Sequence, residues 1–184
     1  LEKRNDIELP LVITYELPLD ETYGYKSVIQ YCKNKKIDCM YPKSVNHKVN
    51  QKISDISPDL ILSIYYRKIL PKQLINLPHL GCINIHPSKL PNYRGPIPTA
   101  WAIENGETEF GVTIHYIDEN YDTGGILSQK KIHLKKKNEI FHLRYITTIL
   151  ATEIVINILN KFNKKKYKLP SRKLFNRGKY KSSM

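Results

Sequence analysis

Short apolar runs alternate along this chain with longer segments in which apolar residues recur every three or four positions. The runs are typical of β-strands, and the periodic segments are typical of α-helices. We predict strands at residues 11–13, 37–41, 60–65, 82–86, 112–117 and 126–132 and helices at 25–34, 46–56, 99–105 and 139–162. Because strands and helices alternate, the pattern favours a three-layer α/β fold with a mostly parallel sheet and helices on both faces.

Two of these segments are strongly apolar. Residues 60–65 are apolar almost without interruption, which is typical of a strand buried on both faces. The last helix, with Asn138 as its cap, has apolar residues at a spacing of three or four, which predicts that it packs on the sheet. These positions are Ile140, Leu143, Ile146, Leu150, Ile154, Ile158 and Phe162.

The strand at 82–86 carries candidate chemistry. Asn84 and His86 are two positions apart, so both side chains leave the strand on the same face. Pro87 then ends strand pairing, because proline has no N–H to donate. Open α/β sheets bind ligands beyond the carboxyl ends of their strands, so this pair is a candidate reaction centre. An Asn-x-His pair alone is nevertheless a weak signal, since most such pairs are ordinary surface residues.

Composition narrows the class of protein. The chain has 184 residues, 41% of them hydrophobic and 26% charged, which suits one soluble domain. No apolar run approaches the roughly 20 residues of a membrane span, and no signal-peptide pattern opens the chain. The chain has three cysteines, Cys32, Cys39 and Cys82, which is an odd number, and none of them forms a Cys-x-x-Cys motif. We therefore expect no metal site and a cytoplasmic location.

The net charge of +13 would suit an anionic partner such as RNA or a nucleotide diphosphate. Lysine, asparagine, isoleucine and tyrosine are all abundant, however, so a general compositional bias explains the charge equally well. Residues 161–184 contain ten Lys or Arg and no acid. We interpret this tail as a solvated end, with an RNA-binding arm as the alternative.

Several motifs occur in order along the chain: residues 84–88 (NIHPS), 90–91 (LP), 93–95 (YRG), 111–115 (GVTIH) and 122–124 (DTG). Together they resemble the folate-dependent formyltransferase family. The resemblance covers residues 9–162 and implies a Rossmann-like domain at 1–162 whose first β-α unit is missing. Residues 163–184 would then be a basic tail or a remnant of a C-terminal domain. The implied activity is formyl transfer from 10-formyltetrahydrofolate to a primary amine.

Formyl transfer is acyl transfer, which needs a donor for the oxyanion and a group that manages the proton of the incoming amine. The resemblance assigns these roles to Asn84, His86 and Asp122. Alone, Asp122 would be read as an ordinary turn residue. Beside His86, a carboxylate would raise the imidazole pKa and fix its tautomer.

Further site residues also follow from the resemblance. Those implied to contact the folate donor, largely through backbone groups, are Lys68, Ile69, Leu70, Asp118, Glu119, Asn120 and Tyr121. Those implied to contact the acceptor are Tyr66, Arg67, Tyr93 and Arg94.

The acceptor is indicated by residues 65–67 (YYR) and 45–47 (VNH), which resemble the branch that formylates nucleotide-linked 4-amino sugars. Pro87 and Pro96 depart from that branch, which often has Gly and Arg there. Methionyl-tRNA is the alternative acceptor, supported locally by the basic tail. A second alternative is a non-catalytic remnant that only binds a partner. We expect no membrane span, and the oligomeric state is left open.

Overall fold

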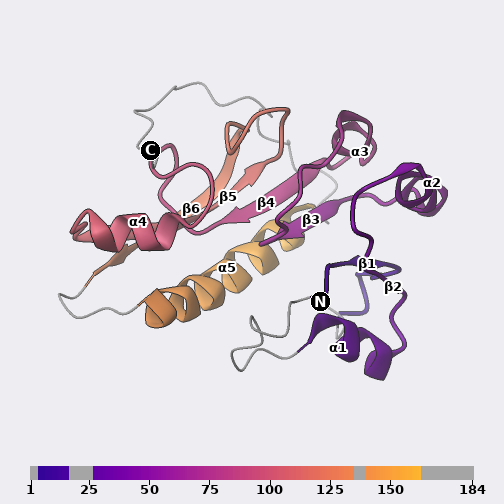
Figure 1. Ribbon diagram of the computed structural model, residues 1–184, viewed down its shortest axis with the longest axis horizontal. Helices are drawn as coiled ribbons and strands as arrows, with labels where there is room; N and C mark the ends of the chain where they lie inside the picture. Colours follow the sequence, from indigo (N-terminus) through magenta and orange to yellow (C-terminus); the bar gives the residue numbers. More distant parts are fainter. Residues whose placement is uncertain (1–3, 17–26, 135–139, 163–184) are drawn as a thin grey trace. The chain divides into compact units, whose positions relative to one another are not determined.

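The computed structural model describes residues 4–16, 27–134 and 140–162 (Figure 1). The chain divides into two compact units. The first unit comprises Leu1–Ser57 with Tyr66–Leu70, and the second comprises Pro58–Tyr65 with Pro71–Met184.

The first unit is a small β-α-β-α arrangement. It contains β1 (Val12–Ile13), α1 (Val28–Lys35), β2 (Cys39–Met40) and α2 (His47–Ile56). β1 and β2 pair in parallel, which α1 allows by carrying the chain back between them. α2 begins where the sequence predicted, because the Asn46 side chain accepts a hydrogen bond from the Val49 N–H at 3.1 Å.

The second unit holds a four-stranded sheet in the order β3-β4-β5-β6. Its elements are β3 (Ile61–Ile64), α3 (Lys72–Asn76), β4 (Cys82–His86), α4 (Pro98–Glu104), β5 (Glu109–Tyr116), β6 (Ile126–His133) and α5 (Ile140–Phe162). β3 and β4 are parallel, whereas β5 is antiparallel to both β4 and β6. The predicted α/β class is confirmed, and the parallel pairs are β1–β2 and β3–β4.

Two details differ from the sequence-based expectation. α3 was not predicted, because five residues are too few to show a helical period. The expectation that residues 60–65 are buried on both faces is wrong, since the side chain of Ile64 is about half exposed (52%). β3 lies at the edge of the four-stranded sheet, so within that sheet it pairs with β4 alone.

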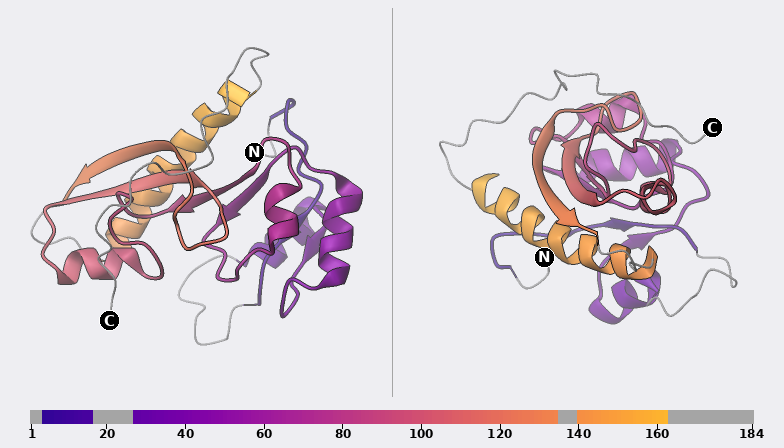
Figure 2. Two further views of the ribbon diagram at one scale, coloured as in Figure 1. Left: turned by 90° about the horizontal axis from the view of Figure 1, so that it is seen from above. Right: turned by 90° about the vertical axis from the view of Figure 1, so that its left-hand side faces the viewer.

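The core of the second unit lies between the sheet and α5. Alternate residues of β4 and β5 face the helix, and their buried partners on α5 are Ala151, Ile154, Val155 and Ile158. Figure 2 shows α5 crossing this one face of the sheet. The helix is long and apolar enough to cross a membrane by length and composition alone, but its buried side chains make the contacts of a core helix. Asn138 and Glu139 lie outside the described residues.

Candidate active site

Polar side chains gather on the sheet face opposite α5. Since Ile83 and Ile85 of β4 face the helix, Asn84 and His86 point to the other side. On β5, His115 pairs with Asn84, and Thr113 pairs with His86. Paired residues in adjacent strands point to the same face, so the four side chains form one polar cluster. His86 and His115 are both buried, at 4% and 2% exposure, so their ring nitrogens require partners within the protein.

Asp122 reaches this cluster from the connection between β5 and β6. Its Oδ1 lies 3.4 Å from His115 Nε2 and 3.5 Å from Asn84 Nδ2. Its Oδ2 lies 3.5 Å from His86 Nδ1 and accepts a hydrogen bond from the Gly95 N–H at 2.8 Å. The structure thus brings Asn84, His86 and Asp122 together and adds His115 to them.

The loop that carries Asp122 depends on close backbone packing. Asp122 itself has a φ of 51°, in the left-handed region that Asp tolerates better than most residues. A Cβ atom on Gly124 would lie 1.8 Å from the carbonyl oxygen of Tyr116, so only glycine fits. The Thr123 hydroxyl donates to the Asp118 carboxylate at 2.6 Å and ties the loop to itself.

A second set of hydrogen bonds fastens the loop that follows β4 to the same sheet face. The Thr113 hydroxyl donates to Ser88 O at 2.7 Å and accepts from the Leu90 N–H at 3.2 Å. The Gln129 amide of β6 donates to Leu90 O at 2.9 Å and to the Thr113 hydroxyl at 2.8 Å. The sequence analysis did not identify Gln129 as a site residue. The only indication in the sequence was a polar side chain within a predicted strand.

Burial decides the charge state of His86. Its Nε2–H donates to the Tyr93 carbonyl at 2.7 Å, which leaves Nδ1 facing Asp122. Burial lowers the pKa of His86 and outweighs the opposing effects of the Asp122 charge and the Tyr93 carbonyl. Asp122 does raise the pKa of His86, as expected, but burial lowers it by more, so the imidazole is neutral at pH 7.

Asp122 remains ionised in the same surroundings. Burial raises the pKa of its carboxyl group, but the hydrogen bond with His115, the positive charge that His86 carries once protonated at low pH, and the Gly95 N–H lower it to about 2. A neutral imidazole therefore presents Nδ1 to a carboxylate, which would stabilise a proton taken up there. With the Asn84 amide as a nearby N–H donor, the cluster can accept a proton and stabilise negative charge.

The predicted acceptor residues of the second unit lie in the same loop. The Tyr93 side chain is buried at 5% exposure, and its hydroxyl donates to Glu107 Oε1 at 2.6 Å. Its backbone carbonyl accepts the bond from His86. Within the described residues, the buried Nε of Arg94 has no hydrogen-bond partner.

The predicted folate-contact residues 118–121 form the turn directly before Asp122. Asp118 accepts the Asn120 N–H at 3.1 Å, and Glu119 pairs with Lys72 at 2.7 Å. Tyr121 is largely exposed (65%). Among the residues that the structure describes, no group of His, Cys, Asp and Glu could hold a metal ion.

The remaining predicted site residues belong to the first unit. Lys68 donates to Pro42 O at 3.1 Å. The Arg67 guanidinium lies 5.3 Å from the centre of the Tyr15 ring, which also packs beside Tyr66 at 6.4 Å. Ile69 is exposed and Leu70 is half-buried. The nearness of all these residues to Asp122 stays a prediction.

Sequence comparisons with known proteins identify formyltransferases. The formyl transferase family profile matches residues 21–158. Methionyl-tRNA formyltransferase of Thermodesulfovibrio yellowstonii is 37% identical over 126 residues, which are 68% of this chain and 41% of that protein. GDP-perosamine N-formyltransferase of Brucella melitensis is 41% identical over 106 residues, which are 56% of this chain and 41% of that protein. The chain thus spans less than half the length of either relative.

A solved structure gives the same result for the fold. Phosphoribosylglycinamide formyltransferase from Bacillus halodurans has a TM-score of 0.74 and 25% identity, and the match covers 88% of this chain and 86% of the other.

Proposed function

Since this chain belongs to the formyl transferase family, we propose that it transfers a formyl group from 10-formyltetrahydrofolate to a primary amine. The observation that carries the proposal is the cluster of Asn84, His86 and Asp122 on one sheet face. Acyl transfer needs an N–H donor and a proton acceptor side by side, and this cluster contains both. The three free cysteines of the described chain favour a reducing, cytoplasmic setting for the reaction.

The roles follow from the charge states. When the amine attacks the formyl carbon, the Asn84 amide donates its N–H to the oxygen that becomes negative. His86 Nδ1 accepts the proton from the incoming nitrogen, because Nε2–H is held by the Tyr93 carbonyl. The Asp122 carboxylate, 3.5 Å away, stabilises the imidazolium that results. Breaking the bond to the folate nitrogen completes the transfer, and the proton on His86 returns to that leaving nitrogen.

The folate donor would lie along the turn at 118–121, which leads directly into Asp122. Backbone N–H and C=O groups of a turn can bind the flat edge of a pterin without particular side chains. The exposed Tyr121 ring would be available for stacking. The folate contacts proposed for residues 68–70 of the first unit rest on the sequence resemblance alone, as do the acceptor contacts proposed for Tyr66 and Arg67.

For the acceptor, we favour a nucleotide-linked amino sugar. Residues 65–67 and 45–47 support this choice through their resemblance to that branch, and the Brucella relative is named for such a substrate. The buried Nε of Arg94, without a partner in the described chain, supports a contact with an anionic part of the acceptor. Methionyl-tRNA is the second candidate, favoured by the Thermodesulfovibrio relative and the basic residues 163–184, which lie outside the described residues.

The test is a formylation assay with 10-formyltetrahydrofolate and two acceptors, an amino-sugar nucleotide and charged initiator methionyl-tRNA. We expect turnover on the sugar nucleotide that Asn84→Ala, His86→Ala or Asp122→Ala each reduces by about 100–1000-fold. Deleting residues 164–184 beyond α5 should change this turnover little. Activity on the tRNA alone, lost with that deletion, would favour the second acceptor. Folded protein without activity on either would support the non-catalytic alternative.

A further inference from the structure

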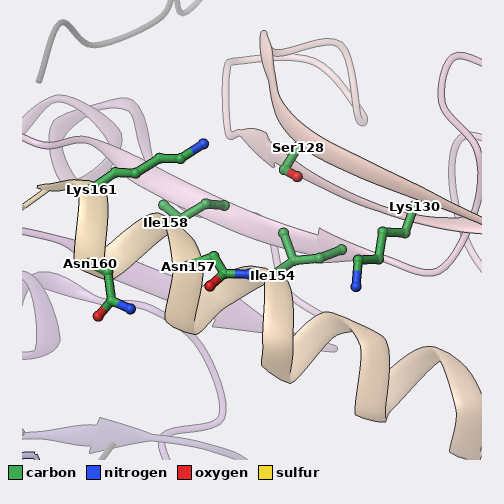
Figure 3. A pocket seen from close by; sticks show the side chains of 7 residues that line it. All are labelled: Ser128, Lys130, Ile154, Asn157, Ile158, Asn160 and Lys161. Carbon is green, nitrogen blue, oxygen red and sulfur yellow. The ribbon is translucent and has the colours of Figure 1, made fainter.

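A pocket of about 360 Å³ lies between β6 and the C-terminal half of α5 (Figure 3). Its lining residues are Ser128, Lys130, Ile154, Asn157, Ile158, Asn160 and Lys161. The pocket lies on the sheet face that packs against α5, whereas Asn84 and His86 point to the opposite face. It is therefore separate from the candidate active site.

The pocket exists because β6 places polar residues where β5 places apolar ones. In the strand register, Ser128 pairs with Ile114 and Lys130 pairs with Val112, so all four side chains face α5. Two apolar residues on β6 would close the space against Ile154. The small side chain of Ser128 and the exposed side chain of Lys130 leave the space open at the edge of the sheet.

The lining supplies hydrogen-bond donors and positive charge. In Figure 3, the Lys161 side chain extends from α5 toward Ser128, and Lys130 extends from β6 toward α5. Lys130 Nζ pairs with Glu153 Oε2 at 2.7 Å, whereas Lys161 makes no ion pair with the described residues. The pocket is therefore lined by two ammonium groups, of which only Lys130 is paired with a carboxylate of the described chain, and the side chains of Ser128 and Asn157 add neutral donors.

We propose that this pocket binds a phosphoryl group, presented by a nucleotide or by an RNA backbone. Ammonium, amide and hydroxyl donors around one space match the oxygens of a phosphoryl group, and charge-assisted hydrogen bonds supply most of the affinity. The volume suffices for a diphosphate with part of its organic substituent. Glu153 opposes binding because its negative charge repels the phosphoryl group and because it forms an ion pair with Lys130.

Titration of the 184-residue chain with pyrophosphate, followed by calorimetry and by amide chemical shifts, tests the proposal. Lys161→Met and Lys130→Met should each weaken binding by about tenfold or more, as expected for losing a hydrogen bond with a charged group. Glu153→Gln should tighten binding, because it removes the opposing charge and frees Lys130. Lys131→Met is the matched control, since Lys131 is exposed, points to the other face and should leave binding unchanged.

A further variant separates binding from folding. Ser128→Leu should fill the pocket, abolish pyrophosphate binding and leave thermal stability unchanged or higher, because Ile154 and Ile158 lie opposite. The absence of saturable binding, or binding that is the same in Lys161→Met and Glu153→Gln, would overturn the proposal. A nucleoside diphosphate and a short single-stranded RNA then distinguish the sources, because RNA binding weakens much more steeply with salt.

Discussion

Replacing Asp122 by Asn should change how the stability of the protein depends on pH. The carboxyl group is only 14% exposed, and its pKa is lowered from an ordinary 3.8 to about 2. A lowered pKa in the folded state stabilises the fold above the unfolded value, and this stabilisation is lost as pH falls through the folded value. The shift corresponds to about 2 kcal/mol, of which about half should be lost by pH 3.

Urea unfolding at pH 7, 4 and 3 measures this loss, with fluorescence of Trp101, the single tryptophan, as the signal. Between pH 4 and pH 3, the free energy of unfolding should fall less in Asp122→Asn than in the parent protein. Asp59→Asn, which removes an exposed carboxylate of the same unit, is the control for the loss of one negative charge. Equal slopes for Asp122→Asn and the parent would refute the conclusion that Asp122 is a buried, ion-paired carboxylate with a lowered pKa.

Three further substitutions and one labelling reaction have expected outcomes. Replacing His86 by Gln should reduce the loss of stability that the parent shows as pH falls below about 6.5, because a buried imidazole with a lowered pKa resists protonation; parallel unfolding curves would contradict this. Gln129→Ala frees the Leu90 carbonyl and should lower kcat with an unchanged circular dichroism spectrum, whereas full turnover would show that the bond is dispensable. Gly124→Ala should cost more than about 3 kcal/mol, measured by urea unfolding, because its Cβ overlaps Tyr116 O; a stable variant would contradict the close approach. Burial and the neighbouring Cys32 raise the pKa of Cys39 to about 11, so iodoacetamide should modify it slowly at pH 8, and rapid labelling would argue otherwise.

The spacing of apolar and polar residues along the chain determined several strands and helices of this protein. The alternation in residues 82–86 placed Asn84 and His86 on one face of a strand, and the structure has that strand with the same bounds. Asn46 starts α2 through its own side chain, and the periodicity of residues 140–162 produces α5. Each of these features depends on residues within one or two turns or on the two-residue repeat of a strand, so the sequence contains them directly.

Other features depended on contacts between distant residues. Asp122 meets Asn84 because β5 pairs with β4 and Gly124 lets the backbone pass Tyr116 closely. The hydrogen bond from Gln129 to Leu90 joins residues 39 positions apart. The net lowering of the His86 pKa comes from burial by everything packed around the ring, whereas the sequence indicated only one charged neighbour. The pocket beside β6 is likewise a consequence of strand register and helix packing, which decide which side chains share a space.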